Sequence, residues 1–153
     1  VEAVGQAYWP SYFGTVARLL KPGGRACIQS IVIDDALFER YVQGSDFIQQ
    51  YIFPGGCLPS PARFRAAAQA AGLRVEEEFA FGRDYAETLR RWHQRFAQQR
   101  SKVQAQGFDA HFQRTWEFYL AYCEAGFDAR SIDVVQYTLI KDGERPASSG
   151  KLL

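Results

Sequence analysis

The sequence predicts an α/β fold, namely half of an open sheet with helices on its faces and a helical insertion before the last strand. Residues 26–33 form an apolar run that does not alternate, which is typical of a strand covered on both faces in a parallel sheet. Strand-like segments follow at 73–81 and 132–140, and two long helical patterns at 86–106 and 109–125 lie between them. Because a complete doubly wound domain needs more than three strands, we expect an amino-terminal half outside this sequence.

The first helix is expected over residues 8–20, where large apolar side chains recur at helical spacing. These side chains are Tyr8, Tyr12, Phe13, Val16, Leu19 and Leu20. Pro10 is tolerated in the first helical turn. Lys21 closes the last turn, where a cation suits the helix dipole, and Pro22 cannot continue the helix. The Gly23–Gly24 pair then supplies the positive φ of a sharp turn into the strand.

Two polar residues, Gln29 and Ser30, interrupt the apolar strand towards its carboxyl end. Ligands of open α/β sheets bind at the carboxyl ends of the strands, so Gln29 to Ile31 are predicted to form the floor of a site. A core amide and hydroxyl with satisfied hydrogen bonds is an equally good explanation of the same two residues.

The middle of the chain contains a loop of unusual composition. Asp34 and Asp35 are expected to cap a short helix before it. Residues 51–61 hold three prolines and two glycines, so they cannot be regular structure, yet they are rich in large apolar groups. We expect this loop to be packed, either over a ligand or as a plain connection. Ser60 is the predicted N-cap of the next helix, which runs to Ala71.

The last third of the chain is predicted to be mainly helical. The second strand, more exposed than the first, leads to a loop at 82–85 and then to helices at 86–106 and 109–125, with Gly126 ending the second. A final strand precedes residues 142–153, a polar tail expected to be disordered. The apolar stripe of the two helices comprises Leu89, Trp92, Phe96, Phe112, Trp116, Tyr119 and Leu120.

Composition excludes several classes of protein. A formal net charge of +1 argues against a nucleic-acid-binding surface. Three widely spaced cysteines indicate reduced thiols in a cytoplasmic protein rather than a disulfide framework. No apolar run has transmembrane length. His93 and His111 have no carboxylate or cysteine at ligand spacing, so a metal site is not expected.

Six sequence blocks occur in a characteristic order. They are Val-Glu-Ala-Val-Gly at 1–5 with Tyr8-Trp9, Leu-Lys-Pro-Gly-Gly at 20–24, Tyr-Ile-Phe-Pro-Gly-Gly-Cys-Leu-Pro-Ser at 51–60, Phe-Gly-Arg-Asp-Tyr at 81–85, Thr-Leu-Arg-Arg-Trp at 88–92 and Phe-Tyr-Leu-Ala-Tyr-Cys at 118–123. On these blocks, residues 1–141 resemble the carboxyl-terminal half of the catalytic domain of the cyclopropane-fatty-acyl-phospholipid synthase family, which includes the mycolic acid cyclopropane synthases. The 51–60 block is the specific one, whereas the Lys-Pro-Gly-Gly turn occurs in many methyltransferases.

The resemblance implies a Rossmann-like class I methyltransferase that uses S-adenosylmethionine. Such an enzyme methylates the double bond of an unsaturated acyl chain, and a bound bicarbonate accepts a proton before the cyclopropane closes. By motif position, Glu2 is the carboxylate that holds bicarbonate, Tyr85 is its phenol ligand and Ile31 contributes its backbone. Gln29 stands where the best-known members have His, which leaves open a methylated product without a ring.

The resemblance also implies an unsaturated acyl phospholipid or a related lipid as substrate. Phe47, Tyr51 and Phe53, together with the two long helices, are expected to line an acyl tunnel, although plain core packing explains such aromatic residues equally well. Positive charge on the first long helix is expected to face phospholipid head groups at the inner face of the membrane, or else to be solvated. The residues concerned are Arg83, Arg90, Arg91, Arg95, Arg100 and Lys102.

The sequence contains no glycine-rich strand-to-helix loop of the kind that binds a nucleotide cofactor. We therefore expect these residues alone neither to bind S-adenosylmethionine tightly nor to be active. Two alternatives stay open: a small-molecule N- or C-methyltransferase of the same fold, and a non-catalytic fragment that binds lipid or dimerises. A homo-oligomer is likewise left open.

Overall fold

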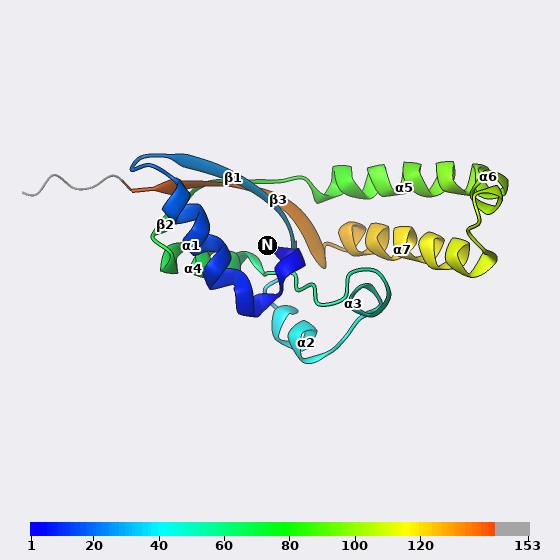
Figure 1. Ribbon diagram of the computed structural model, residues 1–153, viewed down its shortest axis with the longest axis horizontal. Helices are drawn as coiled ribbons and strands as arrows, with labels where there is room; N and C mark the ends of the chain where they lie inside the picture. Colours follow the sequence, from blue (N-terminus) through cyan, green and yellow to red (C-terminus); the bar gives the residue numbers. More distant parts are fainter. Residues whose placement is uncertain (143–153) are drawn as a thin grey trace, which may run out of the picture.

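A three-stranded sheet and a projecting pair of helices make up the computed structural model, which describes residues 1–142 (Figure 1). The strands are β1 (Arg25–Ile33), β2 (Leu73–Ala80) and β3 (Ile132–Lys141). Their order in the sheet is β1-β3-β2, and β3 is antiparallel to both neighbours. Consequently β1 and β2 run in the same direction on either side of the last strand of the chain.

The helices fall into three groups. The amino-terminal segment forms two short 3₁₀ turns and a helix, the middle of the chain forms three helices, and residues 82–128 form the pair with a short helix at its tip (Figure 1). Their bounds are η1 (Glu2–Val4), η2 (Gln6–Tyr8), α1 (Trp9–Leu19), α2 (Phe38–Gln43), α3 (Phe47–Tyr51), α4 (Pro61–Ala70), α5 (Gly82–Gln98), α6 (Arg100–Ala105) and α7 (Ala110–Asp128).

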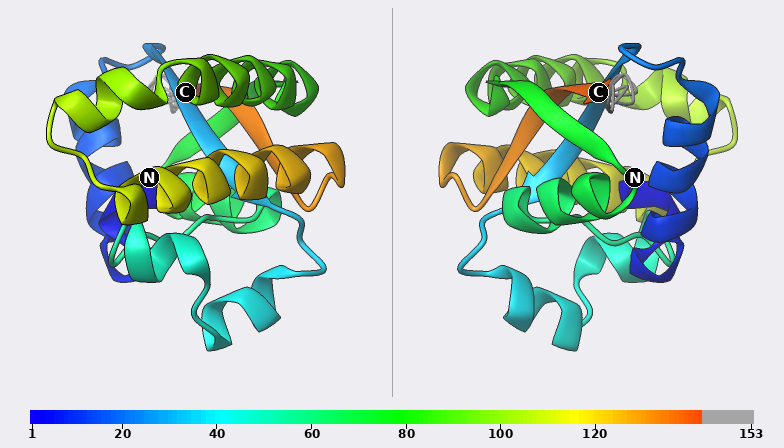
Figure 2. Two further views of the ribbon diagram at one scale, coloured as in Figure 1. Left: turned by 90° about the vertical axis from the view of Figure 1, so that its right-hand side faces the viewer. Right: turned by 90° about the vertical axis from the view of Figure 1, so that its left-hand side faces the viewer.

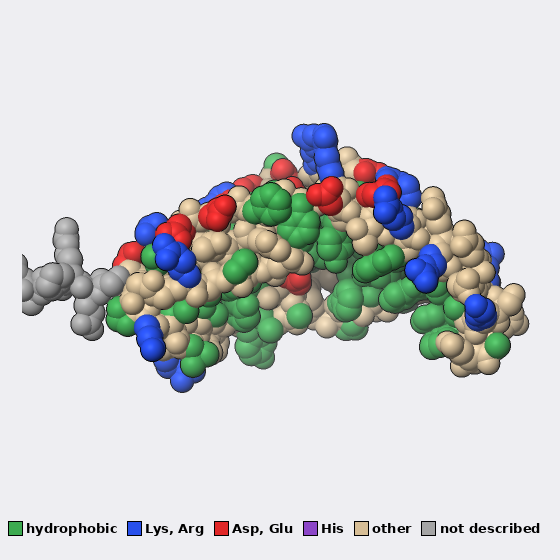
Figure 3. Space-filling model, turned by 90° about the horizontal axis from the view of Figure 1, so that it is seen from above, with side chains coloured by type: hydrophobic (Ala, Val, Ile, Leu, Met, Phe, Trp, Pro, Cys, Tyr) green, Lys and Arg blue, Asp and Glu red, His purple; other side chains and the backbone are tan. Residues whose placement is uncertain are grey.

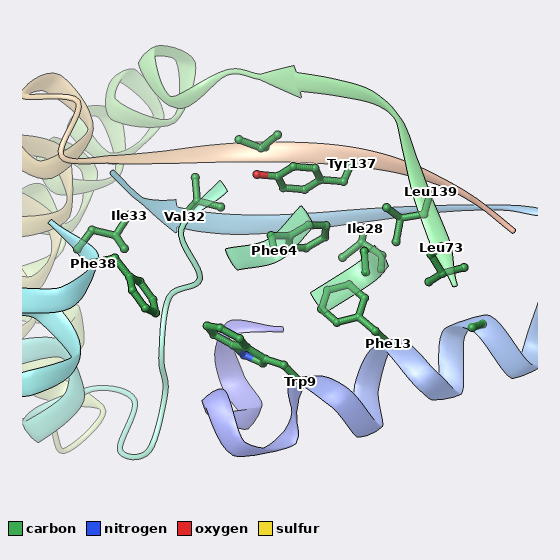
Figure 4. Packing of buried hydrophobic residues seen from close by; sticks show 13 residues of the cluster. Trp9, Phe13, Ile28, Val32, Ile33, Phe38, Phe64, Leu73, Tyr137 and Leu139 are labelled. Atoms are coloured by element: carbon green, nitrogen blue, oxygen red, sulfur yellow. The ribbon is translucent and has the colours of Figure 1, made fainter. Parts of the chain in front are cut away.

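Helices α1 and α4 cover one face of the sheet and bury the main hydrophobic cluster, here called the sheet core (Figure 4). The ring of Phe64 stacks on Tyr137 of β3 with the centroids 3.8 Å apart. Phe13 of α1 meets Phe64 edge-on at 5.0 Å. All three rings are fully buried, so this face supplies most of the apolar burial that stabilises the fold.

A second cluster joins the other face of the sheet to the base of α5 and α7. Leu89, Leu120 and Phe127 are buried there against Val134 of β3. Since neighbouring residues of a strand point to opposite faces, Val134 belongs to this cluster while Val135 belongs to the sheet core. Beyond this base the two helices, which we call the helical pair, project away from the sheet (Figures 1 and 2).

The structure corrects the expectation for the first strand. β1 pairs with β3 in antiparallel fashion, from Arg25 opposite Ile140 to Ile33 opposite Ile132. Its side chains alternate between exposed and buried from Cys27 to Ser30, so it is not covered on both faces along its length. A run of apolar residues specifies neither the direction of a neighbouring strand nor the cover on each face. Among residues 1–142 the one strand paired with β1 is the antiparallel β3, so the expected parallel neighbour is not found in this part of the chain.

Of the two helix N-caps predicted from the sequence, one is confirmed and the other is wrong. Ser60 accepts a hydrogen bond from the N–H of Arg63 at 3.4 Å, as expected of an N-cap. Asp34 and Asp35 do not cap α2, which starts after Leu37 without a side-chain cap. Asp34 instead accepts from the N–H of Ala36, and Asp35 accepts at 3.0 Å from the N–H of Ala62 in α4.

Five other features of the structure differ from the expectations. The predicted loop at 82–85 is the first turn of α5, the long helix breaks at Gln99, and a helix not predicted, α3, begins with a capping box formed by Asp46 and Gln49. Lys141 Nζ, rather than Lys21, donates to carbonyl oxygens at the end of α1. In the predicted apolar stripe of α1, the side chains of Tyr8 and Leu19 are exposed.

Gly126 lies inside α7 instead of ending it, because the helix continues to Asp128. A Cβ at this position would meet the side chain of Ile132 at 3.0 Å, so the glycine allows α7 to approach β3 closely. The disordered tail was predicted over residues 142–153, and all of it except Asp142 lies outside the described residues.

Candidate functional site

Glu2 is fixed at the carboxyl end of β1 by its side chain and its backbone. Its carboxylate accepts a hydrogen bond from the hydroxyl of Ser30 at 2.6 Å, and Ser30 is buried. The carbonyl oxygen of Glu2 accepts from the N–H of Cys57 at 2.8 Å. A carboxylate held at two points in this way is oriented before any ligand binds.

The glycines of the 51–60 block are explained by the close approach of this amino-terminal segment. A Cβ at Gly56 would lie 3.3 Å from the carbonyl oxygen of Glu2, and a Cβ at Gly5 would lie 3.1 Å from the carbonyl oxygen of Gly55. Gly5 and Gly55 both have positive φ. The glycine pair therefore lets the loop and the segment carrying Glu2 cross in contact.

Gln29 is exposed on the sheet face opposite to Ser30. It lies directly across from Gln136 of β3, whose Nε2 donates to Gln29 Oε1 at 3.1 Å. This bond occupies one lone pair of Gln29 Oε1 and leaves the amide N–H₂ of Gln29 available to donate. The residue thus presents a hydrogen-bond donor rather than a base.

Tyr85 lies in the first turn of α5, with its ring centroid 5.0 Å from that of Phe127. Ile31 packs against the same cluster. The structure therefore brings Tyr85 and Ile31 to one face of β1, while Glu2 reaches the adjacent residue, Ser30, from the other face. Two of the four predicted catalytic residues, Gln29 and Ile31, belong to β1. Glu2 is bonded to Ser30 between them, and Tyr85 shares the second cluster with Ile31.

Tyr119 and Cys123 of α7 accompany Tyr85, and sequence reasoning did not single them out as site residues. Burial raises the pKa of Tyr119 to about 12, with further contributions from Cys123 and Tyr85. Burial, followed by the charge of Asp46, raises the pKa of Cys123 to about 12. Both side chains are therefore neutral at ordinary pH, and Cys123 is not an activated nucleophile. Their only signal in the sequence is the block at 118–123.

A groove of about 480 Å³ opens between α5 and α7. Its lining is aromatic and aliphatic except for Arg95 and Gln99. The lining residues are Trp92, Arg95, Phe96, Gln99, Trp116, Tyr119 and Leu120. A cleft of this size and composition suits a flexible apolar ligand.

Aromatic rings continue from this groove in both directions along one side of α7. We call this set the aromatic row, and its members are Phe108, Phe112, Trp116, Tyr119 and Phe53. Successive centroids are separated by 4.5, 5.9, 5.0 and 6.3 Å. The row reaches from the tip of the helical pair to the loop that contacts Glu2.

The three predicted acyl-binding residues do not share one surface. Phe53 ends the aromatic row beside Tyr119, whereas Phe47 packs edge-on against Phe118 at 4.7 Å. Tyr51 packs on Phe47, and Figure 2 shows their helix, α3, beside α7 on the side away from α5. Tyr51 and Phe53 are more than half exposed. Leu58 packs against the sheet core and Pro59 is fully buried, so the expected packing of the loop is confirmed only for its second half.

Known proteins that resemble this chain belong to the family that its motifs indicate. Residues 1–137 match the family described as mycolic acid cyclopropane synthetase. The chain is 46% identical over 146 residues to tuberculostearic acid methyltransferase UfaA1 of Mycobacterium tuberculosis, covering 94% of this chain and 34% of that protein. It is 33% identical over 135 residues to the cyclopropane-fatty-acyl-phospholipid synthase of Escherichia coli strain K12, covering 88% and 34%. The chain spans about a third of the length of these curated relatives.

Solved structures agree with the expected fold class. The cyclopropane synthase MmaA2 of M. tuberculosis aligns with a TM-score of 0.81 at 23% identity, covering 92% of this chain and 52% of that one. The mycolic acid cyclopropane synthase CmaA1, in complex with SAH and CTAB, aligns with a TM-score of 0.79 at 28% identity over the same shares. These similarities confirm an α/β part of a class I methyltransferase fold. Among residues 1–142, no helix is long and apolar enough to span a bilayer.

Proposed function

The chain belongs to the mycolic acid cyclopropane synthetase family, and on that premise we propose that it forms the lipid-binding part of an S-adenosylmethionine-dependent methyltransferase. The proposed reaction adds a one-carbon unit to the double bond of an unsaturated acyl chain. The observation that supports the proposal is the hydrogen bond from Ser30 to Glu2 in β1, together with the cluster that Ile31 shares with Tyr85. Tyr119 and Leu120 of the apolar groove pack against the same cluster or belong to it.

The residues at this end of β1 fit a small oxyanion. Gln29 Nε2 and the phenol of Tyr85 can donate hydrogen bonds to it, and the carboxylate of Glu2 can accept the proton of bicarbonate. When bound, S-adenosylmethionine supplies the methyl group and bicarbonate supplies a proton acceptor. Glu2, already oriented by Ser30, holds that acceptor in place, because position rather than basic strength decides proton removal from a short-lived carbocation.

The groove contributes binding, exclusion of water and electrostatic stabilisation. An acyl chain lying along Trp116 and Tyr119 is shielded from water, which would otherwise capture the carbocation. Aromatic ring faces stabilise a nearby cation. Because Tyr119 is neutral up to a pKa of about 12, it presents a phenol to the substrate and not a competing nucleophilic phenolate.

A second product is favoured by one specific observation. By the resemblance, Gln29 stands where the best-known members of the family have His, and its amide cannot accept a proton as an imidazole can. The relative at 46% identity is named a methyltransferase, whereas the E. coli relative is named a cyclopropane synthase. Both points support a methyl-branched acyl chain as an alternative to the cyclopropane, and proton NMR of the isolated lipids distinguishes the two.

Mass spectrometry of acyl chains tests the reaction in cells that express the longest polypeptide containing this chain. We expect a gain of one methylene unit in unsaturated chains. Glu2→Gln and Tyr85→Phe should each lower the yield by about 100-fold or more, while the exposed Glu77→Gln on β2 serves as a control of equal charge change. Yields from Glu2→Gln equal to those from Glu77→Gln would refute the assignment.

Cofactor binding by the 153 residues alone is tested separately. We propose that the cofactor-binding loop lies in another part of a longer polypeptide, so the isolated chain should show no heat of binding with micromolar S-adenosylmethionine. A labelled-cofactor assay distinguishes the alternatives, because a lipid-binding or dimerising module transfers no label to any acceptor. We place the protein in the cytoplasm, where its three cysteines, all free in the structure, stay reduced.

A further inference from the structure

The two ends of the helical pair differ in charge. Residues 91–117, which we call the distal end, contain five Lys or Arg and two Asp or Glu. The rest of the pair, residues 82–90 and 118–130, contains three Lys or Arg and four Asp or Glu. Figure 3 shows basic side chains towards the tip, whereas the acidic side chains on this face lie closer to the sheet.

Ion pairing leaves specific cations available at the distal end. Arg91 pairs with Glu87 at 2.7 Å and Arg100 with Glu117 at 2.6 Å, so these two are compensated. The remaining cations of the distal end, Arg95, Lys102 and Arg114, form no ion pair among residues 1–142. Three uncompensated positive charges on one projecting end attract a polyanionic surface.

Exposed aromatic rings occur at the same end. Trp92 is 54% exposed and Phe108 is 43% exposed, so two large rings are accessible beside these cations. Phe108 also begins the aromatic row, which leads through Phe112 and Trp116 into the groove. Aromatic residues beside free cations are the composition of segments that rest in the interface of a lipid bilayer.

We propose that the distal end of the helical pair docks on the surface of an anionic phospholipid bilayer. Arg95, Lys102 and Arg114 contact lipid phosphates, and Phe108 and Trp92 enter the boundary between head groups and acyl chains. The aromatic row then provides a path from the bilayer into the groove. This path rests on the proposed function, but the docking depends only on charge and exposed aromatic surface.

A second copy of the chain fits this surface less well. Two copies meeting through their distal ends would bring the same uncompensated cations together, and like charges in contact oppose association. An anionic bilayer instead satisfies the cations and the aromatic rings at once.

Sedimentation with vesicles tests the docking without any cofactor. The 153-residue chain should bind vesicles of phosphatidylcholine with phosphatidylglycerol, bind pure phosphatidylcholine far less, and dissociate as salt is added. The double substitution Arg95→Gln with Lys102→Gln should lower the partition coefficient about thirtyfold. Arg83→Gln with Arg130→Gln removes two charges near the sheet and should leave it unchanged. Circular dichroism confirms that each variant is folded.

Tryptophan emission provides an independent readout. Trp92 is exposed, whereas Trp9 is only 4% exposed. We expect the tryptophan emission to shift to the blue when the chain binds vesicles. Loss of this shift in Trp92→Phe would locate the contact at the distal end. Equal binding to the two vesicle types would overturn the proposal, as would an equal loss in the Arg83/Arg130 variant. Charge-dependent binding without any shift of Trp92 emission would also overturn it, in favour of a soluble acidic partner. None of these outcomes depends on methyl transfer, so failure of the docking is distinguishable from failure of the proposed reaction.

Discussion

Aromatic side chains are distributed differently in the sheet core and in the helical pair. In the sheet core, Phe13, Phe64 and Tyr137 are fully buried and in contact with one another. In the helical pair, Trp92 and Phe118 are more than half exposed even though their neighbours are also aromatic. The same residue type is therefore buried in one region and accessible to a ligand in the other, and the difference in its contribution to stability can be measured.

The largest expected effect is that of Phe64→Ala. Deleting this buried ring removes its stacking on Tyr137 and leaves a cavity, so the free energy of unfolding should fall by about 3–5 kcal/mol. Urea denaturation measures it. The same deletion in the helical pair, Phe118→Ala, should cost about 1 kcal/mol or less because the ring is already half in water. Equal losses at the two positions would contradict the contrast between the regions.

The junction between the regions should be the next most sensitive position. The N–H of Gly82 donates to Asp133 at 2.8 Å, and an added Cβ would collide with that carboxylate and lie 3.1 Å from Phe127. We expect Gly82→Ala to lower the free energy of unfolding by about 1–3 kcal/mol in the same urea experiment.

Gly14→Ala provides the matched control, since this glycine lies in α1 with nothing within 4 Å of the added methyl group. That variant should be about as stable as the parent or up to about 1 kcal/mol more stable. A harmless Gly82→Ala would show that the two regions are not rigidly joined there.

A phenol in each region links stability to alkaline pH. Burial raises the pKa of Tyr119 to about 12 and also raises the pKa of Tyr137 above its ordinary value of 10.0. The unfolded chain therefore releases these protons first, so stability that is fully present below pH 10 should be lost between pH 10 and 12. Tm measured against pH should fall less steeply in Tyr119→Phe and in Tyr137→Phe than in the parent chain.

The two phenols should differ at neutral pH. The hydroxyl of Tyr137 is buried without a hydrogen-bond partner among residues 1–142, so Tyr137→Phe should stabilise the chain by about 1 kcal/mol. No such gain is expected from Tyr119→Phe. A less stable Tyr137→Phe would mean that the hydroxyl has a partner, for example a buried water.

The smallest expected effect concerns the ion pairs that join the two long helices. Arg90 contacts Glu87 at 2.6 Å, Glu124 at 2.9 Å and Asp128 at 3.0 Å. Because its side chain is 41% exposed, Arg90→Ala should cost about 0.5–1 kcal/mol, and the cost should shrink as salt is added. Arg91→Ala, which removes a contact to Glu87 alone, should have a smaller effect. If the loss of unfolding free energy in Arg90→Ala did not change with salt, it would arise from lost packing of the Arg90 side chain rather than from its ion pairs.

Local chemistry made much of the fold predictable. The Ser60–Pro61 start of α4 follows from side-chain capping and a fixed φ, which involve only adjacent residues. Gly82 and Gly126 were misinterpreted because their roles depend on Asp133 and Ile132, which approach only when β3 is in place. The antiparallel pairing of β1 was missed for the same reason.

The candidate site was predictable only where the family motif supplied the residues. By itself, Glu2 is an ordinary carboxylate, and its contact with Ser30 spans 28 positions of the chain. The bond from Gln136 that orients Gln29 spans 107 positions and depends on the strand register. Tyr119 lies in a quoted block, but nothing local distinguishes it from other aromatic residues of the helical stripe.

The central place of β3 in the sheet affects how the chain is made. A ribosome completes β1 and β2 before residues 132–141 emerge, so the two facing strand edges wait unpaired through most of translation. Unpaired edges are sites of aggregation, and pairing over so long a separation is slow. We therefore expect the facing edges of β1 and β2 to be aggregation-prone in the nascent chain until the ten residues of β3 are released.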